Sequence, residues 1–206
     1  MKAIVVYESH WGSTAAIARA IAEGIGPGAR ALSTAEADAA AIADADLIVA
    51  GAPVIGFRLA TDEMLRNIAT SPSKASAAPD ISHPSMRSWL AALPPHPRVA
   101  AASSVGGRPA EGSSVATTWP AGLPAGRGRS AAFETRIWWS PGGATGTIDR
   151  ELQRAGYRPL AKARRFIVKG ASGPLREGEV ERARQWGSEL ARAMGGLPGA
   201  GVSPAS

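Results

Sequence analysis

Short apolar runs alternate with helical repeats over the first 51 residues. Residues 3–7 and 47–51 are continuous apolar runs bounded by polar residues, which is typical of strands covered on both faces. Between them, apolar positions over 14–25 recur every three or four residues, as in a helix that buries one face. This succession favours a parallel α/β sheet, because parallel neighbours need a crossover connection.

Weaker signals fill the space between these elements. Residues 30–33 predict a second strand, followed by an Ala-rich helix that reaches Ala45 and is capped by Ser33 or Thr34. Pro53 is expected to close the strand over 47–51, since proline cannot donate to a strand ladder.

Residues 71–130 differ in composition, with 9 of the 16 prolines and 6 of the 24 glycines, and are predicted to be mostly loop. One short amphipathic helix is expected here, with Pro84 at its first position. Its apolar positions are Met86, Trp89, Leu90 and Leu93. Residues 95–129 show neither period, apart from a brief strand expected within 98–105, and we interpret them as an insertion.

Regular patterns resume at residue 131. Strands are expected over 131–135 and 165–169, and a helix is expected over 147–155. Apolar positions from Val180 to Met194 predict a last helix with one buried face. The segment 195–206 is rich in Gly, Pro and Ser and is expected to be a disordered tail.

The formal net charge is +6 over 206 residues. It is spread along the chain: −3 over 1–70, +4 over 71–130 and +5 over 131–206. We expect a compositional bias towards Arg rather than a nucleic-acid site, although a basic patch that attracts an acidic partner stays open.

Two absences limit the classes of protein. The chain has no cysteine, which excludes disulfides, thiolate metal sites and a cysteine nucleophile. The apolar run over 3–7 is too short for a signal peptide or a membrane span. We therefore expect a cytoplasmic protein without a membrane span.

The turn after the first predicted strand carries the chemistry. Ser9, Ser13 and Thr14 place three hydroxyls around Gly12, where the following helix presents unpaired N–H groups and the positive end of its dipole. Such a turn suits a single phosphate group. No Lys follows a Gly here and no Gly-x-Gly-x-x-Gly is present, so nucleoside-triphosphate and dinucleotide loops are excluded.

These residues resemble the flavodoxin family. The pattern Val5-Val6-Tyr7-x-Ser9-x-x-Gly12-x-Thr14-x-x-x-Ala18-x-x-Ile21 is similar to the flavodoxin signature. The resemblance implies a doubly wound, five-stranded parallel sheet of order 2-1-3-4-5 in a three-layer α/β/α fold. One domain would span 1–194, with the insertion around 71–129. The C-terminal run 170–186 and residues 133–136 resemble flavodoxin-type proteins of high-GC, actinobacterial type.

The resemblance implies FMN as the cofactor. The phosphate would be held by Ser9, His10, Trp11, Gly12, Ser13 and Thr14. The flavin ring would lie between two further loops, whose candidate residues are Pro53, Val54, Ile55, Gly56, Phe57, Thr135, Trp138 and Trp139. Phe57 and the two tryptophans are candidates to stack on the ring. Gly56 is a candidate for a peptide flip, and ordinary turn chemistry explains it equally well.

Three functions are compatible with these features. The first is an FMN-binding electron carrier that shuttles electrons between a reductase and an acceptor. The second is an FMN-dependent oxidoreductase resembling NAD(P)H:quinone reductases or protoporphyrinogen dehydrogenases. The third, suggested by the long insertion, is a partner-binding protein whose flavin site has decayed.

The remaining candidates for chemistry are weaker. The three histidines, His10, His83 and His96, have no carboxylates at metal-ligand spacing, and we expect His10 to be a solvated loop residue. Ser172 is expected to be a turn or cap residue. Pro174 and Trp186 are expected to be a helix start and a buried anchor.

Overall fold

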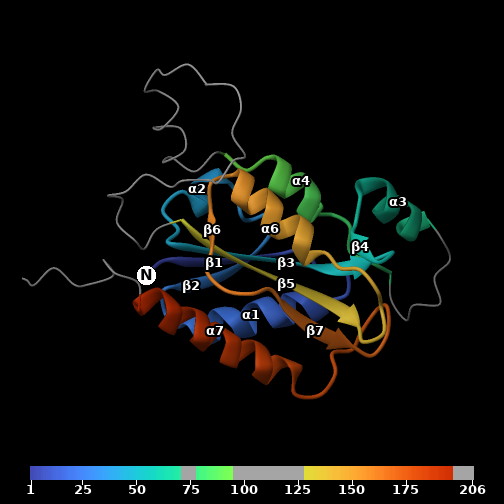
Figure 1. Ribbon diagram of the computed structural model, residues 1–206. Coiled ribbons are helices and arrows are strands. Elements are labelled where there is room, and N and C mark those ends of the chain that lie inside the picture. The colour runs from blue at the N-terminus through green and yellow to red at the C-terminus, as the bar shows by residue number, and fades with distance from the viewer. Residues whose placement is uncertain (71–77, 95–127, 197–206) are drawn as a thin grey trace, which may run out of the picture.

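The centre of the protein is a parallel sheet with the strand order β2-β1-β3-β5-β6 (Figure 1). The computed structural model describes residues 1–70, 78–94 and 128–196. The strands are β1 (Ala3–Tyr7), β2 (Ala29–Ser33), β3 (Leu47–Ile55), β5 (Arg129–Ile137), β6 (Arg158–Pro159) and β7 (Arg164–Val168). β6 and β7 share the last position, because they pair in turn with the start and the end of β5. The predicted doubly wound, five-stranded order is confirmed.

Helices cover both faces of this sheet (Figure 1). One face carries α1 (Ser13–Ile25) and α7 (Glu179–Gly195), and the other carries α2 (Ala39–Ile42), α4 (Met86–Ala91) and α6 (Thr145–Arg154). Alternate residues of β1 enter the two cores. Ile4 belongs to the core with Trp89, whereas Val5 belongs to the core with Trp186. The three-layer arrangement follows from this alternation.

The helix after β2 is shorter than predicted, and the prediction of its cap was wrong. Asp38 caps α2 by accepting a hydrogen bond from the Ala41 amide at 2.7 Å. Ser33 instead closes a turn, in which its amide and its hydroxyl both donate to the Glu36 carboxylate at 2.8 Å. Local side-chain bonds of this kind compete with helix formation, so the helix begins later.

Strand β3 does not end at Pro53, which corrects a second prediction. It continues to Ile55, and Pro53 lies in register with Thr135 of β5. The chain then turns back into β4 (Arg58–Leu59), which pairs antiparallel with Val54 and Ile55. Proline removes only one donor from the ladder. The extension carries the end of β3 towards the carboxyl edge of the sheet.

Two helices follow β4 along the chain. The unpredicted helix α3 (Asp62–Thr70) follows β4 directly (Figure 1). Helix α4 is confirmed as amphipathic, with Met86 and Trp89 buried. Its cap is Ser85, which accepts from the Ser88 amide at 3.1 Å, so Pro84 precedes the helix and its predicted position was wrong.

The C-terminal helix packs against α1 and begins later than predicted. Helix α7 begins after Gly178 and continues through Gly195, so the prediction that Pro174 starts it was wrong. Trp186 is buried, as predicted. α7 lies against α1 so closely that a Cβ on Gly187 would be 2.2 Å from the Ile21 carbonyl oxygen. The brief strand within 98–105, most of the insertion and most of the tail lie outside the described residues.

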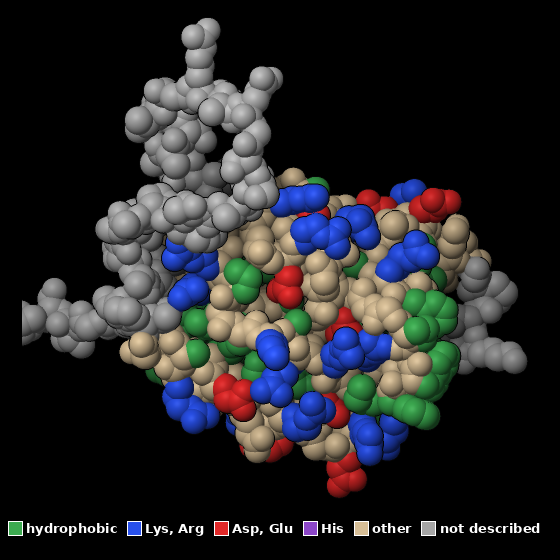
Figure 2. Space-filling model, viewed as in Figure 1, with side chains coloured by type: hydrophobic (Ala, Val, Ile, Leu, Met, Phe, Trp, Pro, Cys, Tyr) green, Lys and Arg blue, Asp and Glu red, His purple; other side chains and the backbone are tan. Residues whose placement is uncertain are grey.

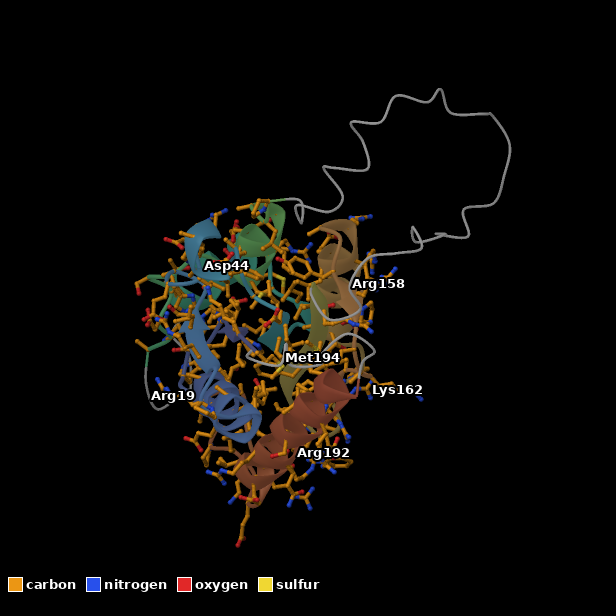
Figure 3. All side chains as sticks on the ribbon, turned by 90° about the vertical axis from the view of Figure 1, so that its left-hand side faces the viewer. Arg19, Asp44, Arg158, Lys162, Arg192 and Met194 are labelled. Atoms are coloured by element: carbon orange, nitrogen blue, oxygen red, sulfur yellow. The ribbon has the colours of Figure 1, made fainter. Side chains whose placement is uncertain are left out.

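Charged side chains are distributed over more than one face. Figure 2 shows Lys and Arg side chains scattered among Asp and Glu. Arg158, Lys162 and Arg192 lie at the end where the parallel strands begin, opposite their carboxyl ends (Figure 3).

In the described ranges, no helix is long and apolar enough to cross a membrane.

Candidate functional site

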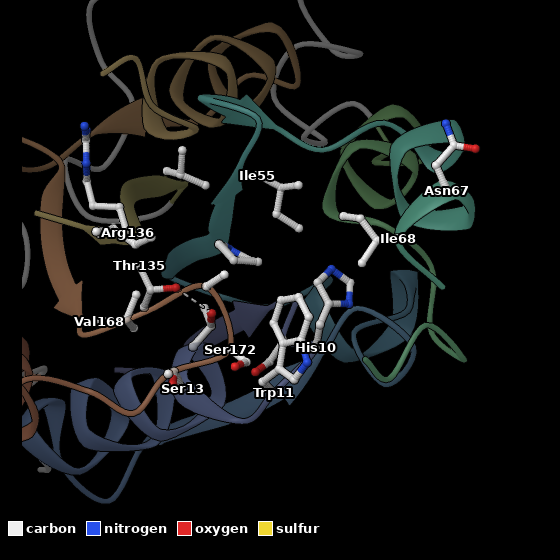
Figure 4. A pocket seen from close by; sticks show the side chains of 17 residues that line it. His10, Trp11, Ser13, Ile55, Asn67, Ile68, Thr135, Arg136, Val168 and Ser172 are labelled. Carbon is white, nitrogen blue, oxygen red and sulfur yellow. Dashed lines mark hydrogen bonds between the residues drawn. The ribbon is translucent and has the colours of Figure 1, made fainter. Parts of the chain in front are cut away.

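A pocket of about 410 Å³ opens at the carboxyl ends of β1, β3, β5 and β7 (Figure 4). It is lined by Ser9, His10, Trp11, Ser13, Thr14, Pro53, Val54, Ile55, Asn67, Ile68, Thr135, Arg136, Ile137, Val168, Ala171, Ser172 and Gly173. The place is the switch point between β1 and β3, where doubly wound folds bind ligands. Its volume lies in the range of roughly 300–1,000 Å³ that small-molecule sites occupy.

The start of α1 forms one wall of this pocket. Its first helical bond runs from the Ala16 amide to the Gly12 carbonyl at 2.9 Å. The N–H groups of Ser13, Thr14 and Ala15 precede that bond and have no helical acceptor. Gly12 has φ +86° and no side-chain cap is present, so a ligand meets the amides directly.

A glycine is required at position 12 by backbone conformation. A Cβ there would meet no heavy atom within 4 Å, so space is available for a side chain. The left-handed φ is what disfavours other residues. Gly12 itself lies beside the pocket lining rather than within it.

The state of the Ser9 hydroxyl indicates whether the turn can bind an anion. Its Oγ is buried and has no hydrogen-bond partner; among the described buried side chains, only Ser130 Oγ shares this property. A buried hydroxyl without a partner is costly, and Ser9 lines the pocket. The residues of the turn therefore fit a phosphate group that accepts from Ser9 and from the α1 amides.

Thr14 connects the turn to the neighbouring strand. Its Oγ1 lies 2.8 Å from Oγ1 of Thr135, and both side chains are buried. A hydroxyl can donate one bond and accept others. If the Thr135 hydroxyl donates to Thr14 Oγ1, the hydroxyl hydrogen of Thr14 is left to donate to another acceptor.

The opposite part of the pocket is apolar. Pro53, Val54 and Ile55 from β3 and Ile137 and Val168 from the neighbouring strands contribute its surface. Figure 4 shows Trp11 and His10 on one side and Thr135 and Val168 on the other. An anion-binding turn beside an apolar slot suits a planar ring that carries a phosphate.

The remaining ring-binding candidates lie on adjoining loops. Phe57, Trp138 and Trp139 are exposed, by 52%, 74% and 57%, and with Gly56 they lie outside the pocket lining. Their loops touch, because the Gly143 amide donates to the Phe57 carbonyl at 3.0 Å. Phe57 and Trp138 lie within two positions of the lining residues Ile55 and Ile137 in the chain.

Gly56 and Phe57 form the two-residue turn between β3 and β4. Their φ values are +56° and +68°, the combination that a tight hairpin of this length requires. For Phe57 this conformation is strained, because its Cβ crowds the backbone. The turn accounts for Gly56 without reference to a ligand.

His10 is buried, which corrects the expectation of a solvated residue. Its side chain is only 1% exposed, with Nε2 2.9 Å from Glu8 Oε1 and Nδ1 2.7 Å from the Asp80 carbonyl oxygen. Burial by itself lowers the pKa of His10, but the bonds to Glu8 and Asp80 outweigh it and raise the pKa above its ordinary value.

A second buried pair supports the β5–α6 loop. The Glu134 carboxylate accepts from the Ala144 and Thr145 amides at 2.7 and 3.0 Å and from Arg136 Nη1 at 2.9 Å. Arg136 also donates to the Gly142 carbonyl at 2.7 Å. The pair fixes the loop that carries Trp138 and Trp139.

The sequence analysis missed the loop after β7 and helix α3. Ala171, Ser172 and Gly173 line the pocket, and a Cβ on Gly173 would lie 2.8 Å from Ser13 Oγ. The signal for this loop was its place after a parallel strand, since the carboxyl ends of such strands meet. For α3, the apolar spacing of Leu65 and Ile68 was available.

Metal chemistry has no support in the part of the chain that the structure describes. There, no group of three or more His, Asp or Glu side chains could hold a metal ion.

Comparisons with known proteins establish the fold. No family model and no curated protein sequence matches the chain. A flavodoxin from the domain Archaea shares 18% identity over 94% of this chain and 99% of its own, with a TM-score of 0.54. Oxidised flavodoxin 1 from Bacillus cereus shares 16% over 93% and 98%, with a TM-score of 0.55. A flavodoxin, WrbA-like protein from Agrobacterium tumefaciens shares 16% over 94% and 96%, with a TM-score of 0.54. The chain therefore has a flavodoxin-like fold.

Proposed function

We propose that this protein binds FMN noncovalently and carries electrons between a reductase and an acceptor. The observation that carries the proposal is the buried, unpartnered Ser9 hydroxyl beside the uncapped start of α1. Both face a pocket whose other wall is apolar. The flavodoxin-like fold supports this choice, because flavodoxins, which share it, are FMN proteins.

The turn after β1 holds the phosphate in this proposal. The α1 amides and the hydroxyls of Ser9, Ser13 and Thr14 donate to its oxygens, and the helix dipole favours the negative charge. No basic side chain belongs to the turn apart from His10, so binding depends on oriented hydrogen bonds. Donor groups that are already in place lose little conformational freedom on binding.

The ends of β3, β5 and β7 hold the ring. In this proposal Pro53, Ile55, Ile137 and Val168 exclude water from its faces, and one or more of the exposed side chains Phe57, Trp138 and Trp139 cover it. Bound FMN would supply the one- and two-electron redox chemistry. The residues around it set how well negative charge on the reduced ring is tolerated.

A reconstitution assay tests the carrier function. FMN-loaded protein is mixed with NADPH and an electron acceptor, either a quinone or a cytochrome, with and without a reductase that transfers electrons from NADPH to flavoproteins. A carrier is reduced only when the reductase is present and then passes electrons to a cytochrome. Steady NADPH oxidation by the protein alone contradicts the carrier proposal and supports a stand-alone oxidoreductase.

A further inference from the structure

Segment 80–86 is attached to the phosphate-binding turn by bonds that converge on two buried residues. The Asp80 amide donates to the His10 carbonyl oxygen at 2.9 Å, and His10 Nδ1 lies 2.7 Å from the Asp80 carbonyl oxygen. The Met86 amide donates to Glu8 Oε2 at 2.9 Å. Glu8 and His10 thus join the turn to a part of the chain at least 70 positions away.

The acceptor atoms around His10 determine which of its ring nitrogens carry a hydrogen. A carbonyl oxygen can only accept, so Nδ1 carries a hydrogen. Nε2 lies 2.9 Å from Glu8 Oε1, and this contact is a hydrogen bond only while one proton lies between the two atoms. With that proton the pair of Glu8 and His10 is neutral overall; without it the pair carries a charge of −1.

Burial makes loss of this proton disruptive. Glu8 is fully buried and the His10 side chain nearly so, so little water is available to separate two facing acceptors. A carboxylate and a ring lone pair at 2.9 Å repel one another. The same change places an unbalanced negative charge beside the proposed phosphate-binding turn.

Other groups around His10 do not replace the missing proton. The His83 ring is stacked on His10, with centroids 5.4 Å apart, and its Nε2 donates to the Ser9 carbonyl oxygen at 3.2 Å. The Ser82 hydroxyl and amide lower the pKa of Asp80, which therefore stays anionic. The titratable and charged groups that face His10 or share its cavities are Glu8, Asp80, His83, Tyr7, Arg19 and Arg136.

We propose that Glu8 is a positioning residue for the anion site, acting through His10, and that the proton they share makes phosphate binding depend on pH. This inference rests on the proposed FMN site. While the pair holds its proton, the turn is fixed to segment 80–86. When the proton leaves, Glu8 and His10 repel one another, which weakens their bonds to segment 80–86, and the unbalanced negative charge repels the anion.

The direction of the pH effect follows from His10. Its pKa is raised by Glu8 and Asp80 against the opposing effect of burial. The contribution of a group with a raised pKa is complete below its ordinary value, about 6.5, and is lost as the pH rises through the raised value. The shared proton, and with it the bound phosphate, should therefore be lost as the pH rises above this raised pKa.

The Glu8→Gln variant removes the negative charge of residue 8 and keeps its hydrogen bonds. A Gln amide oxygen accepts from the Met86 amide, and its NH₂ donates to Nε2 of a neutral His10, whose Nδ1–H still donates to Asp80. All of the bonds remain, but no proton is left to lose. Glu189→Gln is the matched control, because Glu189 forms an exposed pair with Arg164 at 2.8 Å.

The test measures FMN dissociation constants from pH 7 to pH 10 for the three proteins. Over this range the phosphate is a dianion, since its second pKa is about 6. We expect affinity to fall about tenfold in the wild type and in Glu189→Gln, the factor for losing one charge-assisted hydrogen bond. Glu8→Gln should show no such fall. Equal pH profiles for the wild type and Glu8→Gln overturn the proposal.

Hydrogen exchange in the ligand-free protein distinguishes this proposal from the proposed function. Protection factors of the Asp80 and Met86 amides should decrease at alkaline pH in the wild type and stay constant in Glu8→Gln. If the wild type binds neither FMN nor inorganic phosphate, the proposed function fails and exchange alone decides. Protection that changes equally in both proteins overturns the role of the pair.

Discussion

Thr14 Oγ1 and Thr135 Oγ1 lie 2.8 Å apart and join the first turn of α1 to the end of β5. The contact is buried and connects the turn that we propose to bind the FMN phosphate with the strand that borders the apolar slot. Two parts of the site that are more than 100 positions apart are thereby held in one geometry.

Thr14→Val should weaken FMN binding by about 1.5–3 kcal/mol, the usual value of a hydrogen bond to a charged acceptor. Valine keeps the shape of threonine and removes only the hydroxyl. Thr135→Val is the matched control, because it removes the partner and leaves the Thr14 donor in place, and its loss should be about 1 kcal/mol. Dissociation constants measured by titration compare them. Unchanged affinity in Thr14→Val would contradict the assignment of the phosphate turn.

Gly12→Ala should lower both the stability and the FMN affinity of the protein. Gly12 and Gly178 begin helices α1 and α7 with nearly the same backbone, φ +86° and +81°, and a Cβ at either would meet nothing within 4 Å. Alanine in the left-handed region costs about 1–2 kcal/mol. Urea unfolding of the ligand-free variants should show a similar loss for Gly12→Ala and Gly178→Ala.

Only the first of these variants should lose affinity for FMN, since Gly12 lies between the lining residues Trp11 and Ser13, whereas neither neighbour of Gly178 in the chain lines the pocket. An equal effect of both variants on FMN binding would show that the loss comes from stability alone.

Phe57→Asn should stabilise the ligand-free protein and weaken FMN binding. Asparagine tolerates a positive φ better than phenylalanine, and Phe57 is half exposed, so little apolar burial is lost. We expect a gain of about 1 kcal/mol in the free energy of unfolding. Chemical denaturation and FMN titration of the same preparation measure the two effects. A stabilised variant that retains full affinity would remove Phe57 from the ring site.

The variants Trp138→Ala and Trp139→Ala test which of the two exposed tryptophans covers the flavin ring of bound FMN. A stacked tryptophan quenches flavin fluorescence, and its loss should cost about 0.5–1.5 kcal/mol of affinity. The corresponding Phe variant should restore most of the affinity, because it keeps a flat apolar surface. If both alanine variants and their combination bind FMN with unchanged quenching, neither side chain contacts the ring.

The elements around the candidate site that depend only on residues adjacent in the sequence were predicted correctly. The apolar run over β1, the turn around Gly12 and the repeat of α1 are local patterns, and the structure confirms these elements. The extension of β3 through Pro53 was not predicted, because its partner Thr135 is remote and a single missing donor did not end the strand.

The burial of His10 also had no local signal. It depends on residues 80–86, which lie about 70 positions further along the chain. The loop after β7 was likewise overlooked as part of the site, because its Gly-Ala-Ser-Gly sequence is ordinary for a turn and only its place after a parallel strand indicates the pocket. Contacts over such distances decide which polar residues line a pocket.

The most direct test of the account is the visible spectrum of the purified protein during titration with FMN, with riboflavin as the control. Riboflavin has the same ring and lacks the phosphate. The account predicts saturable FMN binding with a shifted flavin spectrum and riboflavin binding that is weaker by at least tenfold, a difference of about 1.4 kcal/mol. Equal binding of the two flavins, or no binding of FMN, would contradict it.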